Sequence, residues 1–498
     1  MSRGSVLFPV ATTSGAITGQ VRRRKAKHKF HRRHASTTKC QSKELEDALV
    51  REQVLVGELV QWCVSRGFSG SGLAVRPPIV STTKEKRGRG LEATRRVEKG
   101  ECVLTLPLRS GIVDEAEGHP PSARAAIEKA PWGVRLACRL LQERKKGEES
   151  AYAPYLELIP ENVETSPLHY AEEEISRACY PPMEKEIEEM RAAVKKWYDD
   201  LNGGEGKEAL AGATMEEFKD AVAVVHSRTY GVSSGDTGEG YFRALLPLAD
   251  LLNHGGDEYI DETRSVESTI STETVAWSEI TDEDEESEIM FTAQKSLEPG
   301  EEALMSYGER SNDHFLLYYG FVPRRNPHDD VIIFENFDSA MMWHAMCFDE
   351  FWRREDIDIR EQNAVRAYKE TSKMLRETSD GALIDAEPRL KVLSDGRVDA
   401  RVLAAFAALY AGDTELANTE HTDRESLNAA RKDIALRCEQ LIRTVQKQSG
   451  AGEAEEMLLA ATNNNNNNTS EKLNVIDAYR RHKMWILRDC VSKLRVEL

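Results

Sequence analysis

The residues with the clearest chemical potential stand at the end of an apolar run. The segment LLPLADLLNHGG, residues 245 to 256, places Asn253 and His254 directly after leucines and before two glycines. A strand end capped by polar side chains is the simpler interpretation of this pattern. The alternative is that an amide and an imidazole, held in place by the apolar run, face a ligand.

A second polar group is predicted to point inward from a helix. Thr214 and Glu217 have the spacing of a capping box, which predicts a helix start. Apolar residues then recur at helical intervals, and Arg228 lies on the same face as Ala221 and Val225. Because a buried guanidinium needs an anionic partner, Arg228 forms either an internal salt bridge or a bond to the carboxylate or phosphate of a ligand.

Two tyrosines complete this set. Tyr307 and Tyr319 lie in MSYGERSNDHFLLYYGFVP, residues 305 to 323, and each is followed by a glycine. A tyrosine in such apolar surroundings is usually a core residue whose hydroxyl bonds to the backbone. Taken singly, each polar residue has a structural explanation, but their combination in this order indicates a shared ligand site.

Several other kinds of site are missing from the sequence. It contains no GxxxxGK[ST] phosphate loop, no GxSxG nucleophile elbow and no HExxH zinc motif, and the 12 histidines show no metal-ligand spacing. The GRG at 88 to 90 lacks the third glycine of a dinucleotide-binding loop. We therefore expect no metal site.

Charge is distributed unevenly along the 498 residues. Residues 1 to 43 carry 11 Lys or Arg and no acid, so the remaining chain holds all 85 acidic residues and only 56 of the 67 basic ones. Such an acidic body argues against nucleic-acid binding, which needs a basic face. It favours a basic protein partner.

The cysteines and the hydropathy pattern restrict the compartment. None of the eight cysteines forms a CxxC pair, which argues against a zinc cluster and against a disulfide scaffold. No apolar run approaches the length of about 18 residues that spans a membrane. We expect reduced thiols, an intracellular or organellar location and no membrane partner.

Residues 1 to 43 have the composition of a targeting segment. They are rich in Ser, Thr and Arg, which predicts an organellar transit peptide for a chloroplast or mitochondrion. The block RRRKAKHKFHRR alternatively indicates a nuclear signal or a nucleic-acid-binding arm. A disordered arm without an address, in a cytoplasmic protein, is the third interpretation.

Periodicity predicts alternating β-rich and helical stretches. A helix pattern starts near residue 44 with leucines at helical spacing. The turns VEKGE and LEPGEE resemble each other, which predicts two strand–turn–strand units of similar local structure. The predicted segments are strands in 88–108, helices in 122–230, an exposed acidic insertion at 257–288 and strands in 289–308.

The C-terminal third is predicted to be a separate helical region. The asparagine tract in ATNNNNNNTS, residues 461 to 470, is predicted to be a flexible loop. The helices are expected at 337–353, 361–378, 399–411, 424–448 and 471–496.

These motifs together resemble the SET-domain protein methyltransferases, in particular the Rubisco large-subunit lysine methyltransferase-like branch. The resemblance is carried by NH at 253 to 254, SYG at 306 to 308, SN at 311 to 312 and YGFV at 319 to 322. GRGLEATRRVEKGE, PYLELIPE, HSRTYGV and AYRRHKMWILRDCVSKL match further family segments.

The resemblance implies an α+β fold. The expected core is a set of small sheets closed by a pseudoknot, in which the last segment threads under an earlier loop. The implied organisation is a disordered basic targeting segment at 1–43, a SET domain at 44–330 with a helical insert at 122–230 and an acidic loop at 257–288, and a helical substrate-binding domain at 331–498.

The resemblance also implies S-adenosylmethionine as the cofactor and assigns roles to single residues. Tyr307 matches the catalytic tyrosine, and Arg228 would pair with the cofactor's carboxylate. The family has an acidic residue about where Arg87 stands, so a contact there must involve the backbone. The implied cofactor-binding residues are Arg228, Asn253, His254, Tyr319, Arg87 and Arg89.

The implied activity is methyl transfer to a protein lysine, with a monomeric enzyme and an accessible lysine on the substrate. Methyl transfer from a sulfonium is an in-line displacement that needs alignment rather than a metal. Histidine is the alternative acceptor within the same fold. A catalytically silent binding protein is a further alternative, although a scaffold has no need of the complete residue set.

Overall fold

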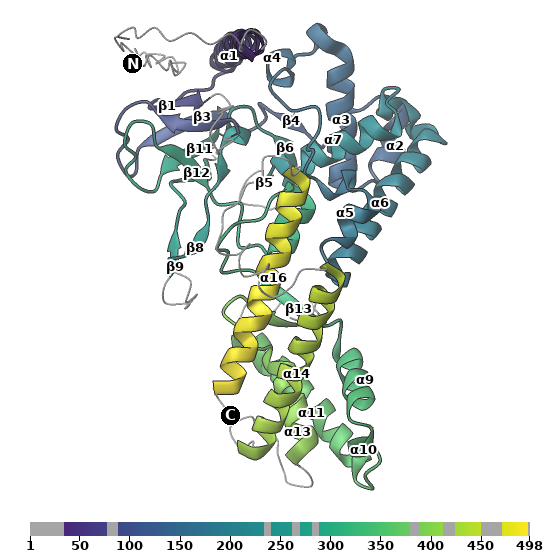
Figure 1. The fold of residues 1–498 in the computed structure, drawn as a ribbon. Coiled ribbons are helices and arrows are strands. Elements are labelled where there is room, and N and C mark those ends of the chain that lie inside the picture. The colour runs from purple at the N-terminus through teal and green to yellow at the C-terminus, as the bar shows by residue number, and fades with distance from the viewer. Residues whose placement is uncertain are drawn as a thin grey trace. The chain divides into compact units, whose positions relative to one another are not determined.

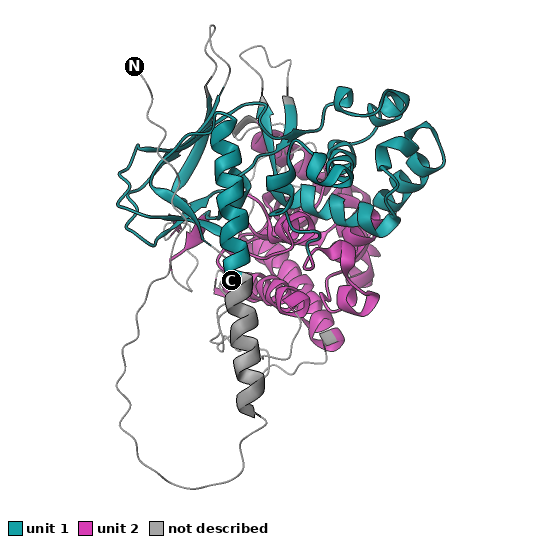
Figure 2. Cartoon of the chain, turned by 90° about the horizontal axis from the view of Figure 1, so that it is seen from above, with its two compact units in different colours: residues 1–163, 192–256, 272–307 teal, residues 164–191, 257–271, 308–498 magenta. Residues whose placement is uncertain are grey.

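The chain forms two compact units, coloured separately in Figure 2. The first comprises residues 1–163, 192–256 and 272–307, and the second comprises 164–191, 257–271 and 308–498. The computed structural model describes residues 34–76, 88–233, 241–260, 269–280, 288–378, 388–411, 424–449 and 471–496. The asparagine tract, Arg87 and most of the predicted targeting segment lie outside the described residues.

Small sheets form the core of the first unit (Figure 1). One sheet has the order β1-β2-β12-β7, a second β10-β11-β3 and a third β4-β6-β5. Their strands are β1 (Leu73–Arg76), β2 (Gly90–Ala93), β3 (Cys102–Pro107), β4 (Ile112–Val113), β5 (Thr229–Ser233), β6 (Tyr241–Leu245), β7 (Asn253–His254), β10 (Val275–Ile280), β11 (Glu288–Ala293) and β12 (Glu302–Met305).

The two similar turns join strands of different sheets. β2 continues through VEKGE into β3, and β11 continues through LEPGEE into β12. β2 then pairs with β12, β3 pairs with β11, and Val97 bridges Leu297 between the turns. The predicted similarity of the two strand–turn–strand segments is confirmed. The structure adds that these two segments pair with each other.

The helices of the first unit follow the predicted insert. α7 begins at the predicted capping box, in which Glu217 N–H donates to Thr214 Oγ1 and Thr214 N–H donates to Glu217. α1 begins ten residues before the leucine pattern, because no Gly or Pro interrupts the preceding chain. The helices are α1 (His34–Ser65), α2 (Arg124–Ile127), α3 (Trp132–Lys146), α4 (Ala153–Leu156), α7 (Met215–Arg228) and α6 (Pro181–Asn202), which is shared with the second unit.

The interpretation of 257–288 as an exposed acidic loop was wrong for a large part of that range. Residues 275–280 form β10, which pairs along its whole length with β11, and Val275 is fully buried. The alternation in VAWSEI is a strand pattern that the surrounding acidic residues obscured. Residues 257–259 and 269–271 form the two-stranded sheet of β8 (Asp257–Tyr259) and β9 (Thr269–Ser271) in the second unit.

The second unit is mainly helical, as predicted. The helix expected at 337–353 is broken at Phe348, whose backbone leaves the helical region at φ −129° and ψ 53°. The other four predicted helices agree with the structure to within four residues. The helices are α5 (Glu172–Ser176), α8 (Asn312–His314), the π-helix η8 (Phe315–Tyr319), α9 (Phe337–Cys347), α10 (Asp349–Trp352), α11 (Ile357–Thr378), α13 (Ala400–Ala411), α14 (Arg424–Ser449) and α16 (Glu471–Val496).

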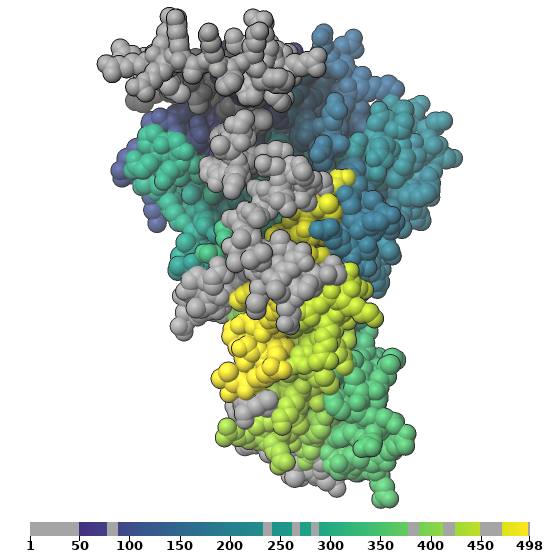
Figure 3. Space-filling model, in the orientation of Figure 1, coloured from purple at the N-terminus to yellow at the C-terminus, as the bar shows by residue number. Residues whose placement is uncertain are grey.

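One sheet of this unit was not predicted. β13 (Asp330–Phe334) pairs with β14 (Leu390–Leu393) in an antiparallel sheet, and every residue of β13 is buried. Because both faces of β13 are covered, its sequence lacks the alternation that marks a half-exposed strand. The yellow α16 packs beside α14, as the space-filling view also shows (Figure 3).

Two further findings concern the described residues alone. The side chains of seven of the eight cysteines are described, and all seven are free thiols. Among the described helices, none combines the length and the apolar character that a membrane crossing requires.

Candidate active site

The run that leads to Asn253 and His254 is a strained reversal rather than a continuous strand. β6 ends at Leu245, and Ala249 N–H donates to Pro247 O at 2.8 Å across Leu248, which has φ 64° and ψ −44°. This is a γ-turn, a conformation that costs a non-glycine residue about 1–3 kcal/mol. Leu248 is 2% exposed, so its burial holds the turn and sets the start of β7.

β7 lies beside the end of β12 as a parallel strand. Leu304 is the partner of Asn253, and Met305 is the partner of His254. Gly255 N–H continues the ladder by donating to Met305 O at 2.9 Å. The parallel pairing brings the start of the SYG segment, which follows β12 directly, to Asn253 and His254.

His254 and Tyr307 are joined directly, although they are 53 positions apart. Tyr307 N–H donates to His254 Nδ1 at 3.2 Å, and the two rings are 5.1 Å apart between centroids. The Tyr307 hydroxyl donates to Leu252 O at 2.7 Å. Burial lowers the pKa of His254 to about 4, so the imidazole is neutral at pH 7 and its Nδ1 acts as an acceptor.

Asn253 uses its amide nitrogen within the protein. Nδ2 donates to Arg89 O at 2.9 Å and to Glu302 Oε1 at 2.7 Å. Arg76 holds the same carboxylate through two further bonds. The strand-cap interpretation therefore holds for the amide nitrogen of Asn253, which bonds within the protein. It does not account for the amide oxygen.

Arg228 is partly buried, with a side chain that is 23% exposed, and it has an internal anionic partner. Its Nη1 lies 3.1 Å from Asp250 Oδ2, and the Asp250 side chain is only 2% exposed. Tyr155 also donates to Asp250 Oδ2, at 3.1 Å. Burial raises the pKa of Asp250, and Arg228 opposes that rise. The salt-bridge interpretation is thus realised, and a bond from Arg228 to a ligand stays a prediction.

Arg228 and Asp250 still have unused polar atoms. Arg228 Nε and Asp250 Oδ1 are buried and have no hydrogen-bond partner among the described residues. Buried polar atoms are rarely left unpaired in native proteins. These two atoms mark a place where a ligand with complementary charges would be stabilised.

The remaining predicted residues have other surroundings. The Arg89 side chain pairs with Glu52 and donates to Leu158 O at 2.7 Å, while its carbonyl accepts from Asn253. Tyr319 ends η8 in the second unit, where its ring packs against His314, Phe315 and Phe321.

The two glycines after His254 are explained by space. A Cβ on Gly255 would lie 2.5 Å from Leu304 Cβ, and one on Gly256 would lie 2.7 Å from His254 Cε1. Glycine at both positions therefore lets β12 and the imidazole approach the backbone.

Asp250, Glu302 and Tyr155 are parts of the site that the sequence did not indicate. Asp250 carried a usable signal, since a single acid within LLPLADLL needs a partner if that run is buried. Glu302 sits in an acidic turn, where nothing distinguishes it from its neighbours.

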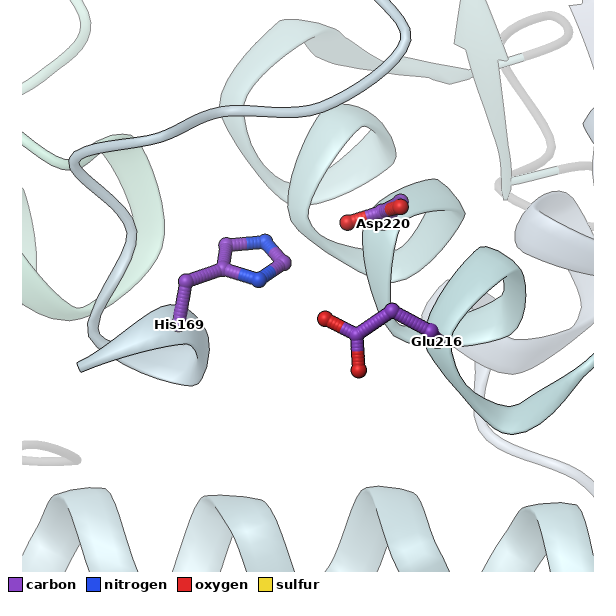
Figure 4. Close-up of side chains that lie close together, drawn as sticks. All are labelled: His169, Glu216 and Asp220. Carbon is purple, nitrogen blue, oxygen red and sulfur yellow. The ribbon is translucent and has the colours of Figure 1, made fainter. Parts of the chain in front are cut away.

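Among the described residues, potential metal ligands also lie outside this site. In the second unit, ligand atoms of Asp257, Glu309 and His328 lie within 4.8 Å of one another, but the Glu309 side chain is 80% exposed. On α7, Glu216 and Asp220 are one helical turn apart and extend from the same side of the helix (Figure 4). Figure 4 also labels His169, which belongs to η4 (Pro167–His169) of the second unit.

Comparison with known proteins defines the class of this fold and site. Residues 88–308 match the SET-domain family. The fold of the chain is similar to that of solved LSMT structures. A crystal structure of the SET domain of LSMT bound to lysine and AdoHcy aligns with a TM-score of 0.58 and 17% identity, over 89% of this chain and 91% of that one. LSMT bound to AdoMet aligns with a TM-score of 0.56 and 16% identity, over 89% of this chain and 92% of that one. The expected α+β class is confirmed.

The alignments with curated relatives cover a smaller share of this chain than the structural alignments do. Actin-histidine N-methyltransferase of Xenopus tropicalis is 27% identical over 287 residues, which is 55% of this chain and 44% of that protein. The chloroplastic ribulose-1,5 bisphosphate carboxylase/oxygenase large subunit N-methyltransferase of Nicotiana tabacum is 22% identical over 316 residues, 61% of this chain and 57% of that protein. The chain thus spans about half the length of these relatives.

Proposed function

We propose that this protein is an S-adenosylmethionine-dependent protein N-methyltransferase whose acceptor is a lysine side chain. The observation that carries the proposal is the joining of Asn253, His254 and Tyr307 in a SET domain. The structures of LSMT with AdoMet and AdoHcy support the choice of cofactor.

The polar atoms of the site suit the amino-acid end of this cofactor. That end carries a carboxylate and an ammonium group. Arg228 Nε is a buried donor without a partner among the described residues, and Asp250 Oδ1 is a buried acceptor in the same condition. A zwitterion would pair with both, whereas a simple anion would leave Asp250 unsatisfied. Asn253 and His254 would hold the cofactor through the amide oxygen and the backbone.

Tyr307 would act beside the transferred methyl group. When bound, the cofactor supplies a methyl group attached to a positively charged sulfur. A lone pair in line with the sulfur–methyl bond can attack the methyl carbon. Donation of the hydroxyl proton to Leu252 O fixes the rotation of the Tyr307 oxygen. An oxygen held in this way can accept weak C–H···O contacts from a polarised methyl group. Alignment of this kind can lower a barrier by several kcal/mol.

A lysine acceptor must lose a proton before it can attack. A free lysine has a pKa of about 10.4, and burial beside a positive charge lowers that value and favours the neutral amine. Tyr319 before GFV and the binding of lysine in the LSMT structure support lysine. We further propose that the helical region from 331 docks the protein substrate, that the enzyme is a monomer and that its compartment is a chloroplast or mitochondrion.

Histidine is the second candidate acceptor. The actin-histidine enzyme of Xenopus tropicalis is more similar in sequence than the tobacco enzyme, at 27% against 22% identity. A neutral imidazole is available near pH 7 without a pKa shift. The two acceptors therefore differ in how the methylation rate depends on pH.

The decisive experiment is a binding measurement followed by identification of the product. Calorimetry with S-adenosylmethionine should show binding at a single site, and absence of binding would refute the proposed function. Incubation of the enzyme with organellar and cytosolic extracts and labelled cofactor, followed by mass spectrometry, should then locate the methyl group on lysine. Methylation of histidine alone would replace lysine by the second candidate.

A further inference from the structure

Four neighbouring strands each contribute one residue to a cluster in one sheet, with Glu302 two positions along β12 from Leu304, the partner of Asn253. β1, β2, β12 and β7 are adjacent in that order, and they carry Arg76, Gly90, Glu302 and Asn253 respectively. Arg76 is the direct partner of Gly90 in the β1–β2 ladder. Residues paired across a ladder point to the same face of the sheet.

The Glu302 carboxylate is bonded to the other two side chains of this cluster, Arg76 and Asn253. Arg76 donates to both oxygens of Glu302, at 2.7 and 2.8 Å, and its side chain is only 7% exposed. Glu302 Oε1 also accepts from Asn253 Nδ2 at 2.7 Å. A two-pronged bond between arginine and carboxylate defines both position and orientation of the carboxylate.

Gly90 provides the room in which they meet. A Cβ at this position would lie 2.6 Å from Glu302 Oε1, 2.9 Å from Arg76 Nη2 and 3.0 Å from Asn253 Nδ2. Any side chain on β2 at this point would separate the three groups.

This arrangement permits only one orientation of the Asn253 amide. Nδ2 faces two acceptors, Glu302 Oε1 at 2.7 Å and Arg89 O at 2.9 Å. A flipped amide would place its oxygen against a carboxylate and a carbonyl, and both hydrogen bonds would be lost. The amide oxygen therefore points away from Glu302 and Arg89.

We propose that Glu302, held by Arg76, is a positioning residue that presents the Asn253 amide oxygen as an acceptor to the cofactor. The proposal rests on the proposed function, because the ammonium group of S-adenosylmethionine is the donor that this oxygen would meet. Glu302 acts only through Asn253.

A double-mutant cycle tests this dependence. Glu302→Gln offers one acceptor oxygen to both Arg76 and Asn253, so one bond is lost. We expect the Kd for S-adenosylmethionine, measured by calorimetry, to rise about tenfold. In the Asn253→Ala background the same substitution should leave the Kd unchanged. An equal rise in both backgrounds would overturn the proposal, because Glu302 would then act independently of Asn253.

The matched control is Glu298→Gln in the same turn. Glu298 is also paired with an arginine, Arg96, but its side chain is 57% exposed. Its substitution should leave the Kd at the wild-type value. With Glu302→Gln, turnover at saturating cofactor should change less than about twofold, since only binding is weakened. A fall in turnover equal to the fall in affinity would contradict a positioning role.

A measurement on the cofactor-free protein separates this proposal from the proposed function. In a sample with 15N-labelled asparagine side chains, the Asn253 amide protons should exchange slowly in the wild type and much faster in Glu302→Gln. Fast exchange in the wild type would overturn the positioning role even if the cofactor binds. Slow exchange in a protein that binds no cofactor would refute the proposed function and leave the orientation of the amide intact.

Discussion

At the scale of single residues, the partly buried Arg228 forms an internal ion pair, and we propose that it also binds the cofactor. Its bond to Asp250 compensates for the desolvation of both groups. The same pair retains a buried donor and a buried acceptor without partners among the described residues. A ligand that paired with these two atoms would be stabilised by them, which is the basis of the proposed cofactor contact.

Tyr307→Phe should separate chemistry from binding. The substitution removes the hydroxyl that donates to Leu252 O, but it keeps the backbone N–H that donates to His254. We expect turnover to fall about a hundredfold, because the oxygen beside the methyl group is lost. The Kd for the cofactor should stay close to that of the wild type. Steady-state kinetics and calorimetry measure the two quantities.

Tyr152→Phe is the matched control for Tyr307→Phe. Tyr152 also donates its hydroxyl to a carbonyl in the first unit, Gly111 O at 3.0 Å. Its loss should reduce stability slightly and leave turnover unchanged. Equal turnover in wild type and Tyr307→Phe would remove Tyr307 from the proposed catalytic role.

His254 should make both stability and binding sensitive to acid. The pKa of His254 is about 4 in the folded protein because of burial, against about 6.5 in an unfolded chain. Between these values the unfolded chain binds a proton that the folded protein does not, so the free energy of unfolding falls as the pH is lowered from about 6.5 to about 4. His254→Gln removes this effect. Its destabilisation relative to wild type, from urea unfolding, should be largest near pH 7 and shrink toward pH 4.

His119 provides the control for that pH dependence. Burial also lowers its pKa to about 4, yet it bonds to Gln142 rather than to Tyr307. His119→Gln should show a similar pH effect on stability while cofactor binding is unchanged. If the free energies of unfolding of wild type and His254→Gln differed by the same amount at every pH, the assignment of the pH effect to His254 would be contradicted.

At the scale of elements, β7 depends on the strained turn before it and on the strands beside it. The γ-turn at Leu248 changes the direction of the chain after β6. The short helix η6 (Ala249–Leu251) then leads into β7. With only two residues, β7 has little stability of its own. Pairing with β12 holds it in place.

Gly90→Ala should disturb the sheet, whereas Gly88→Ala in the same GRG motif should not. A Cβ at Gly90 would lie 2.6 Å from Glu302 Oε1, whereas a Cβ at Gly88 would have no heavy atom of the described residues within 4 Å apart from its chain neighbours. Overpacking of this kind costs about 1–3 kcal/mol. Thermal unfolding should show the loss for Gly90→Ala alone, together with weaker cofactor binding. Equal midpoints for the two variants would show that the cluster of Arg76, Glu302 and Asn253 tolerates a Cβ at residue 90.

At the scale of the whole chain, a buried lysine joins distant segments of the second unit. Lys483 on α16 is 2% exposed, and its Nζ lies 2.9 Å from both Asp313 and Asp329. Asp329 also accepts from Asn312 N–H at 2.9 Å. The C-terminal helix therefore holds the segment that begins α8 and leads to Tyr319. The pKa of Lys483 is raised well above its usual range by these carboxylates, although burial opposes the rise.

Lys483→Met should strongly destabilise the protein. It leaves buried carboxylates without their cation, which costs about 3–5 kcal/mol. Adding Asp313→Asn and Asp329→Asn should restore much of the loss, because the uncompensated charges are removed. Urea unfolding measures the free energy of unfolding of the wild type, of Lys483→Met and of the triple variant. Lys493→Met is the control on the same helix, since the Lys493 side chain is 43% exposed in its pair with Asp489; an equal loss there would contradict the special cost of burial.

Local patterns in the sequence predicted much of this molecule. The capping box at Thr214, the helices after residue 337 and the two similar turns are set by neighbours in the chain, so their signals are local. The NH and SYG motifs predicted a shared site, and the structure brings His254 and Tyr307 into contact. The strands β10 and β13 were missed because acids obscured one pattern and complete burial removed alternation from the other.

The partners within the site were decided only by the tertiary structure. The sequence by itself determined that Arg228 needs an anion and that Asn253 and His254 end an apolar run. That the anion is Asp250, that Asn253 donates to Glu302 and that His254 accepts from Tyr307 depend on strands brought together by folding. Hydrogen bonds and ion pairs extend over a few ångströms in space, whereas sequence spacing reports only the neighbours along one element.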